Sequence, residues 1–396
     1  MTDLFYPMAR QCPFAPPREV AGIQAGGGVP RVTIWNGTRP WLFTRYDDAR
    51  VVLSDPRFSS DKGRPGYPLS SPAAGSEVTT DPTLLIMDNP DHDHYRRLVL
   101  SEFTVKRAEA LRPVVRGFAD HHIDRMLQGP RPADLVTALA LPVALAVICE
   151  LLEVPYEDRE FFRSRTHTMG SVEVTTETAA AARKELQDYL VSLVETRERR
   201  PGDDFISRMA VRHVRTGTMT TGLLGAMCLL LVTAGHDTAA NMMALGTLVL
   251  LEHPDQFAAL ARDPGAAAGA TEELLRHLTI VQRGIRRIAI EDVEVNGHPV
   301  RAGEGVIAAI NIANRDPAKF TSGDDFDITR DSRHHLAFGY GIHQCLGQAL
   351  ARVELQEFYS ALAGRVPTLR TAVPVEEIRF RSDMAVYGVH QLPVTW

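Results

Sequence analysis

The sequence predicts a mainly helical protein: one large helical domain with small β-sheets near its N-terminus and C-terminus. The chain has 396 residues, 44% of them hydrophobic and 23% charged, which is the composition of a globular protein able to enclose an internal site. Helical patterns dominate from about residue 91 to 278, whereas short strand-like runs lie towards the two ends. No stretch has the composition of a linker, so we expect a single domain spanning residues 1–396.

The elements follow in chain order. The expected strands cover residues 31–35, 40–44, 284–296 and 303–312. The expected helices cover residues 105–127, 139–152, 179–199, 220–251, 266–276 and 346–362. A loop rich in Gly, Pro, Ser and Asp is expected at 59–81. The irregular stretch 315–341 is longer than a simple connection requires, so we expect it to have a function.

Composition and charge exclude several classes of protein. The net charge of −6 argues against a general nucleic-acid binder. The four cysteines lie far apart without a Cys-x-x-Cys pair, which excludes a zinc ribbon or a dense disulfide framework and favours a reducing cytoplasm. The N-terminus lacks the pattern of a signal peptide. The longest apolar run is broken at His236, Asp237 and Thr238, so we expect a soluble protein that does not enter a membrane.

The most informative segment is residues 338–347, FGYGIHQCLG. Its glycines, Gly339, Gly341 and Gly347, permit a tight loop and the close approach of a flat ligand. A helical pattern begins just after Cys345, and a helix N-terminus favours the thiolate form of cysteine, which is a good metal ligand. Phe338 would limit solvent around the sulfur. A lone cysteine in a Gly-rich turn can also be merely structural, but this pattern is long and specific.

The pattern Phe-x-x-Gly-x-x-x-Cys-x-Gly resembles the haem loop of the cytochrome P450 family, the haem-thiolate monooxygenases. The resemblance implies haem b as cofactor and Cys345 as the iron ligand, whose thiolate favours O–O cleavage. It covers essentially the whole chain. The segments CPFAPP, FTVKR, HQCLGQALARVELQ and LPVTW are similar to the soluble actinobacterial branch, whose members oxidise macrolides, terpenoids, other secondary metabolites and foreign compounds.

The segment AGHDT, residues 234–238, interrupts the most apolar helix. Helical spacing puts Ala234 and Thr238 on one face, and the small residues Ala234 and Gly235 would leave room for a ligand. On its own, such a segment could be a buried helix whose polar side chains are satisfied by neighbours. The resemblance implies instead that Asp237 and Thr238 help to deliver protons beside the oxygen site. Ala239 departs mildly from relatives with a second Thr or Ser there.

Glu273 and Arg276 lie three residues apart, a spacing that permits an ion pair on many helices. Here the spacing resembles the family's buried Glu-x-x-Arg pair. Arg330, in FDITR, is the expected third partner. We expect all three residues to be structural.

Haem propionates need cationic or hydrogen-bonding partners. His92 and Arg96 resemble the family's His-x-x-x-Arg propionate clamp, and Arg287 and His343 match its later members. Relatives often have Arg where His94 stands.

A rival interpretation takes His92 and His94, with Asp91 or Asp93, as a divalent-metal site. The i, i+2 spacing at the start of a helix would splay those ligands, so the propionate interpretation is favoured.

The resemblance also implies a substrate pocket above the haem, with a mostly aliphatic lining and therefore an apolar substrate. The expected lining residues are Leu84, Leu85, Met87, Leu230, Ala234, Ile285 and Val386. Each of these side chains could instead be ordinary core. The loop at 59–81 would suit a movable lid.

We expect the electrons to come from NAD(P)H through a separate ferredoxin and reductase, because no Gly-x-Gly-x-x-Gly follows a strand. A basic patch that could steer an acidic ferredoxin is predicted from Arg96, Arg97, Lys106, Arg107, Arg112 and Arg352. Solvated surface charges are the alternative.

Two other functions remain open from the sequence. A peroxide-driven peroxygenase is disfavoured because such relatives commonly lack the acid–alcohol pair that Asp237 and Thr238 supply. A haem sensor or carrier without turnover is disfavoured by the same intact segment. The expected activity is therefore insertion of one oxygen atom from O2 into a C–H or C=C bond of a largely apolar small molecule, a secondary metabolite or a foreign compound.

Overall fold

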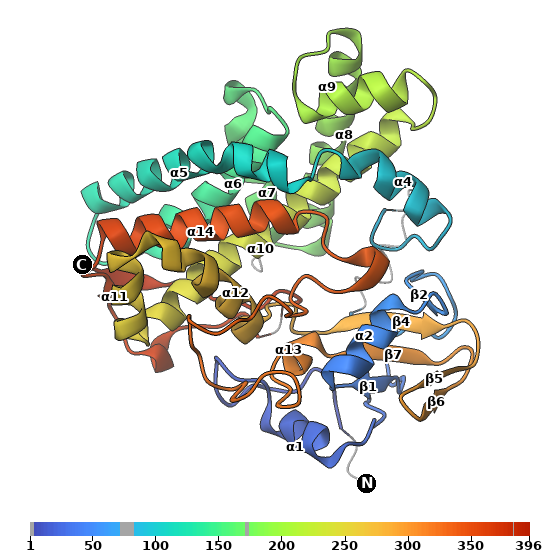
Figure 1. The fold of residues 1–396 in the computed structure, drawn as a ribbon. Coiled ribbons are helices and arrows are strands. Elements are labelled where there is room, and N and C mark those ends of the chain that lie inside the picture. The colour runs from blue at the N-terminus through green and yellow to red at the C-terminus, as the bar shows by residue number, and fades with distance from the viewer. Residues whose placement is uncertain (1–3, 72–82, 171–173, 383) are drawn as a thin grey trace.

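The computed structural model describes residues 4–71, 83–170, 174–382 and 384–396. The long helices gather on one side of the molecule, and most of the strands lie together on the other side (Figure 1). The main helices are α1 (Arg18–Gly26), α2 (Tyr46–Ser54), α4 (Asp91–Leu100), α5 (Val105–Gln128), α6 (Leu141–Leu151), α7 (Arg159–Gly170), α8 (Thr176–Arg199), α9 (Phe205–Met209), α10 (Thr221–Leu251), α11 (Pro254–Arg262), α12 (Ala267–Leu278), α13 (Ile310–Ala313) and α14 (Gln348–Arg365). The predicted mainly helical fold with small β-sheets is confirmed.

The strands form three small sheets with the orders β1-β7-β4-β2, β3-β9-β8 and β5-β6. Their bounds are β1 (Trp41–Phe43), β2 (Phe58–Ser59), β3 (Ala133–Asp134), β4 (Ile285–Ala289), β5 (Val293–Val295), β6 (His298–Val300), β7 (Gly305–Ala308), β8 (Arg370–Thr371) and β9 (Pro393–Thr395). In the first sheet, β1 pairs with β7 in parallel and β4 pairs with β7 antiparallel. This sheet therefore joins segments from both ends of the chain.

Helix α10 is the central helix of the core. Its N-cap Thr220 accepts a hydrogen bond from the Leu223 amide, and the helix packs against α6, α8 and α14. By length and composition α10 is apolar enough to cross a membrane, yet two long stretches of it are buried inside the protein. Between those stretches, residues 230–238 are mostly less buried. This change in burial marks the part of the helix whose side chains are only partly covered by the rest of the protein.

The two ends differ from the prediction in detail. The run 31–35 forms single bridges, Arg31 with Trp41 and Thr33 with Phe5, rather than a strand. The expected strand 303–312 stops at Ala308, and α13 follows. The Asn314 side chain fixes that helix end through bonds to Thr279 Oγ1 and the Leu336 amide, each 2.7 Å long. These tertiary bonds override the β-propensity of the local residues.

Further helices were missing from the prediction, among them α2, α7 and α11. They are nine, twelve and nine residues long, which leaves few turns over which a helical pattern can be recognised. Part of the expected lid, residues 72–81, lies outside the described residues. The long stretch after α13 is irregular up to residue 340, as expected.

Candidate active site

The loop before α14 is closed by its own backbone. The Cys345 amide donates to the Phe338 carbonyl at 2.8 Å. Gly339 and Gly341 have φ angles of 72° and 74°, a conformation that favours glycine. A Cβ on Gly341 would lie 2.4 Å from the Leu53 carbonyl oxygen, so α2 packs directly on this turn.

Gly347 departs from the expectation. Its φ is −82°, an ordinary value, and a Cβ there would meet no protein atom within 4 Å. Backbone strain therefore does not explain this glycine. Its amide instead donates to the Cys345 sulfur.

Cys345 lies just before the N-terminus of α14 and is exposed. Atoms packed around the sulfur raise the pKa of the thiol, whereas the Gly347 amide and the guanidinium groups of Arg96 and Arg352 lower it. Arg96 is held in place because its Nη2 donates to the Gln344 carbonyl at 2.5 Å. Burial has the largest effect, so the pKa of the free thiol lies above its ordinary value, and the thiolate that a metal ligand requires would form when the metal ion binds.

A second group of side chains, the basic cluster of His92, Arg96, Arg287 and His343, comes from α4, β4 and the cysteine loop. His92 is 1% exposed, yet neither ring nitrogen has a hydrogen-bond partner among the residues that the structure describes. Its ring centroid lies 4.2 Å from that of His343. His343 lies 2.8 Å from Ser60 Oγ through Nε2 and 3.2 Å from the Leu84 carbonyl through Nδ1.

The electrostatics of this cluster disfavour protonated histidine. Burial and the charge of Arg96 lower the pKa of His92. Burial lowers the pKa of His343 to about 3, with smaller contributions from Arg287 and His92. Both rings are therefore neutral near pH 7.

Arg287 is 6% exposed and donates to the Arg286 carbonyl at 2.7 Å. Among the described residues, no carboxylate lies within 4.0 Å of its guanidinium group. Burial lowers the pKa of Arg287, because the charged form loses its hydration. A buried cation beside two unsatisfied imidazole nitrogens fits a ligand that brings its own carboxylates.

The exposed part of α10 contains the predicted acid and alcohol. Ala234 is exposed in the middle of this otherwise apolar helix. Thr238 Oγ1 donates to the Ala234 carbonyl at 2.6 Å, a back-bond that loosens the helix locally. The prediction that Gly235 leaves room for a ligand is corrected: a Cβ there would lie 2.6 Å from Ile148 Cδ1, so Gly235 permits the close packing of α6.

Asp237 is bound by two residues that the sequence analysis missed. Arg381 Nη1 donates to Asp237 Oδ1 at 2.9 Å, and Asn241 Nδ2 donates to the same oxygen at 3.1 Å. Asn241 lies one turn further along α10 and could have been suspected from its spacing. Arg381 lies 144 residues away, and no local pattern indicates it.

Comparison with known proteins agrees with this geometry. A family model described as Cytochrome P450 matches residues 268–362. Cytochrome P450-SU2 of Streptomyces griseolus is 50% identical over 385 residues, covering 97% of this chain and 94% of the relative. The chain belongs to the cytochrome P450 family.

Solved structures support the same conclusion. The crystal structure of GfsF superposes with a TM-score of 0.94 at 46% identity, covering 99% of this P450 and all (100%) of GfsF. GfsF comes from Streptomyces halstedii. The mycinamicin VIII C21 methyl hydroxylase MycCI of Micromonospora griseorubida, bound to mycinamicin VIII, gives a TM-score of 0.91 at 37% identity, covering 99% and 100% of the two chains. The protein is therefore a P450 monooxygenase, and its family implies haem.

The residues present fit that haem. Cys345 would ligate the iron, and His92, Arg96 and Arg287 would hold the propionates. The rival metal site has no support, since the described residues contain no cluster of three His, Cys, Asp or Glu side chains suited to an ion. His92 is buried whereas His94 is exposed, so the two rings do not share a face.

Glu273, Arg276 and Arg330 come together in one network, as predicted from the sequence. Glu273 and Arg276 are each 0% exposed and form two hydrogen bonds of 2.8 and 2.7 Å. Arg330 Nε lies 3.3 Å from Glu273 Oε1. Arg276 also donates to the carbonyls of Asn314 and Gly323, so this network anchors the irregular stretch that leads to Cys345.

The predicted substrate residues are distributed over several packing clusters of the P450. Leu84 and Met87 are buried in the same apolar cluster that Leu230 packs against. Ile285 packs on Gly339 of the cysteine loop, with its Cδ1 3.4 Å from where a glycine Cβ would lie. Val386 bridges to Val281. Leu85 is 59% exposed, so the protein covers little of its side chain.

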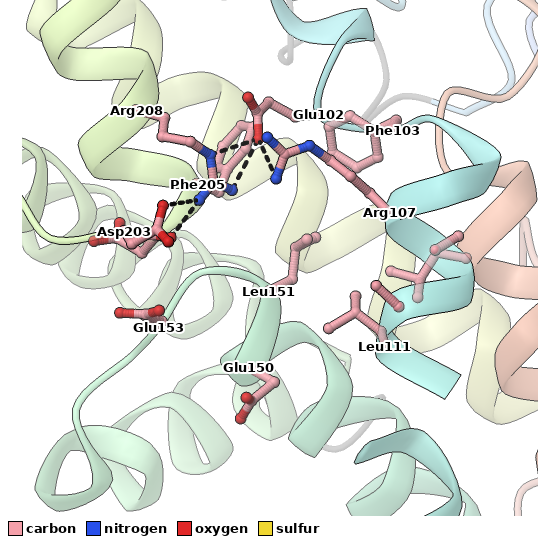
Figure 2. A pocket seen from close by; sticks show the side chains of 14 residues that line it. Glu102, Phe103, Arg107, Leu111, Glu150, Leu151, Glu153, Asp203, Phe205 and Arg208 are labelled. Carbon is pink, nitrogen blue, oxygen red and sulfur yellow. Dashed lines mark hydrogen bonds and ion pairs between the residues drawn. The ribbon is translucent and has the colours of Figure 1, made fainter. Parts of the chain in front are cut away.

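A pocket of about 220 Å³ opens elsewhere, between α5, the end of α6 and α9 (Figure 2). Figure 2 shows the Glu102 carboxylate among arginine side chains, and it lies 2.8 Å from Arg208 and 3.4 Å from Arg107. The ring centroids of Phe103 and Phe205 are 5.8 Å apart. These contacts fasten the segment after α4 to α9, which helps to position the helix that carries His92.

The expected basic patch is weaker than predicted. Four of its six members are paired with carboxylates: Arg97 with Asp93, Arg107 with Glu102, Arg112 with Glu109 and Glu357, and Arg352 with Glu272. Arg96 is half-buried beside the cysteine loop. Lys106 is exposed. Most of the positive charge is thus neutralised locally.

Proposed function

We propose that this P450 inserts one oxygen atom from O2 into a C–H or C=C bond of a largely apolar secondary metabolite of macrolide type. The observation that carries the proposal is the full-length similarity to P450s such as MycCI, whose structure holds mycinamicin VIII. The aliphatic character of Leu84, Met87, Leu230 and Val386 supports an apolar substrate. The electrons would come from NAD(P)H through a separate ferredoxin and reductase in the cytoplasm.

Each part of the site has a distinct task in this proposal. When bound, the haem would supply the chemistry that activates dioxygen. Cys345 would hold the iron as a thiolate, whose charge would be stabilised by the iron itself and by the Gly347 amide, Arg96 and Arg352. The exposed face at Ala234 would leave space next to Thr238.

Asp237 and Thr238 would move protons to this space. The Thr238 hydroxyl already donates to the Ala234 carbonyl, so the lone pairs of its oxygen are left to accept a hydrogen bond from the solvent side. Asp237 is one-third exposed and can exchange protons with water. An acid next to an alcohol thus gives a short relay from solvent.

The proposal is tested with the purified holoprotein, a plant-type ferredoxin, its reductase and NADPH. Macrolactones and terpenoids are first titrated against the ferric protein, and a shift of the Soret band identifies those that bind. Bound compounds are then incubated with the electron supply, and products are sought by mass spectrometry as the gain of one oxygen atom. The variant Cys345→Ser serves as the control without a thiolate ligand.

The expected result is oxygenation of at least one macrolactone by the wild-type protein and none by the control. Oxygenation of terpenoids alone would overturn the macrolide assignment while leaving the monooxygenase activity in place. Product formation with peroxide but not with ferredoxin and NADPH would overturn the proposed electron source.

A further inference from the structure

Arg381 contacts Asp237, the proposed relay acid, from a distant part of the chain. It belongs to the turn formed by residues 380–382 and 384–389, which begins and ends at the bridge between Phe380 and Val389. The Arg381 amide donates to the Gly388 carbonyl at 2.9 Å. Its side chain is 12% exposed and reaches across to α10, where Nη1 lies 2.9 Å from Asp237 Oδ1.

Asn241 completes the contact between this turn and α10. Arg381 Nη1 donates to Asn241 Oδ1 at 3.0 Å, and Asn241 Nδ2 donates to the carbonyl and to Oδ1 of Asp237, at 2.7 and 3.1 Å. The amide is buried, at 4% exposure. A Cβ on Gly388 would lie 1.8 Å from Asn241 Oδ1, so the turn packs on α10 without room for a side chain.

The turn itself is fixed by the side chain of Gln282. Gln282 Nε2 donates to the carbonyls of Arg381 and Ser382 at 3.1 Å each, and also to the carbonyl of Met384. The turn also carries Val386, one of the proposed substrate contacts, which bridges to Val281. A single short segment thus connects the proposed substrate pocket with the acid on α10.

We propose that Arg381 is a positioning residue for Asp237. Its guanidinium group fixes one carboxylate oxygen of Asp237, so that the carboxylate stays against the turn and Asn241 rather than rotating into solvent. Because the cation comes from the turn that carries Val386, the position of the acid depends on the packing of the substrate pocket. This inference rests on the proposed role of Asp237 as the relay acid.

The test compares Arg381→Gln and Arg381→Lys with the wild-type holoprotein. Arg379→Gln is the matched control, since Arg379 is an exposed arginine two residues earlier on the same segment. Product formed per NADPH consumed is measured with the substrate found above, and the thermal midpoint of the ferric protein is measured separately. Each substitution is also made in the background of Asp237→Asn.

Arg381→Gln is expected to lower product per NADPH roughly tenfold, the effect of losing one charge-assisted hydrogen bond. Arg381→Lys keeps the charge and should restore most of the coupling, whereas Arg379→Gln should match the wild type. In the Asp237→Asn background, Arg381→Gln should cause no further loss of coupling, whereas the thermal midpoint should still fall because the bond from Arg381 to Asn241 is lost.

The outcomes separate this inference from the proposed function. If Asp237→Asn lowers coupling but Arg381→Gln does not, Arg381 is not a positioning residue. An equal loss from Arg381→Gln in both backgrounds would also overturn the inference, because the arginine would then act without Asp237. If Asp237→Asn leaves coupling unchanged, the proposed relay itself is wrong.

Discussion

Two buried arginines of this P450, Arg276 and Arg287, have opposite surroundings. Arg276 makes five hydrogen bonds, to Glu273 and to the carbonyls of Asn314, Gly323 and Asp325, which matches the five N–H donors of a guanidinium group. Arg287 is almost as buried, yet it has no carboxylate within ion-pair distance among the described residues.

The difference separates a structural network from a binding site. A buried charge without a partner lowers the stability of the fold. Such a charge is therefore expected where a bound ligand supplies the partner. The Arg276 network is complete within the chain and therefore serves the fold. The basic cluster of His92, Arg96, Arg287 and His343 is incomplete within the chain and therefore fits the propionates of haem.

The largest effect is expected from Glu273→Ala. It would leave Arg276 as a buried charge without its carboxylate, and the free energy of unfolding should fall by about 3–5 kcal/mol. Chemical denaturation of the holoprotein measures this change. Glu294→Ala, at an exposed carboxylate of β5, is the control and should change the value by less than about 0.5 kcal/mol. A small effect of Glu273→Ala would erase the contrast between the two groups.

Arg287→Leu should weaken the retention of haem. It should leave no carboxylate of the protein unpaired, because Arg287 forms no ion pair among the described residues. The loss of one charge-assisted bond to a propionate is worth about 1.5–3 kcal/mol, or roughly a tenfold to hundredfold faster haem loss. Transfer of haem to an excess of an apo-globin scavenger measures the rate. Arg301→Leu, at an exposed arginine of the loop between β6 and β7, should match the wild type. Unchanged haem loss in the Arg287 variant would show that this residue does not bind the propionates.

A pH effect is expected from His277, which lies beside the complete network. Burial, Arg315 and Arg276 lower the pKa of His277 well below its ordinary value. Between that value and about pH 6.5, the unfolded chain binds one more proton at this site than the folded chain. Stability therefore falls as the pH drops below about 6.5, by at most about 1.4 kcal/mol per pH unit from this group.

The measurement for His277 is the free energy of unfolding between pH 7.5 and about pH 5. The variant His277→Gln should lose less stability over this range than the wild type. Equal pH dependence in both proteins would mean that His277 is protonated in the folded state.

The smallest effect on stability is expected from Thr238→Ala. The Thr238 hydroxyl bonds to the Ala234 carbonyl of its own helix, so its loss should change the free energy of unfolding by less than about 1 kcal/mol. Product per NADPH should nevertheless fall, with release of peroxide, because the variant lacks the hydroxyl group that the proposed relay uses. Thr238→Ser is the matched control and should retain coupling. Unchanged coupling in Thr238→Ala would show that the hydroxyl does not deliver protons.

The sequence alone predicted the helical fold and the long helices, since each has a strong apolar pattern of its own. Helix α5 was expected at residues 105–127 and runs from Val105 to Gln128. The helices α2, α7 and α11 were missed, because each spans only nine to twelve residues, too few turns for a periodic pattern to stand out from the flanking loops. The cysteine loop was visible because glycine spacing and the start of a helix are local properties.

The site residues divide along the same line. Glu273 and Arg276 are three residues apart on one helix, so the sequence alone could indicate their pairing. Arg381 and Asp237 meet across 144 residues, and the sequence alone gave no sign of the contact. Gly235 was assigned to the ligand face by its neighbours, whereas the path of α6 decided that it faces Ile148. Sequence patterns determine backbone geometry and helix faces, but only the folded path of the chain determines which distant side chains share a buried space.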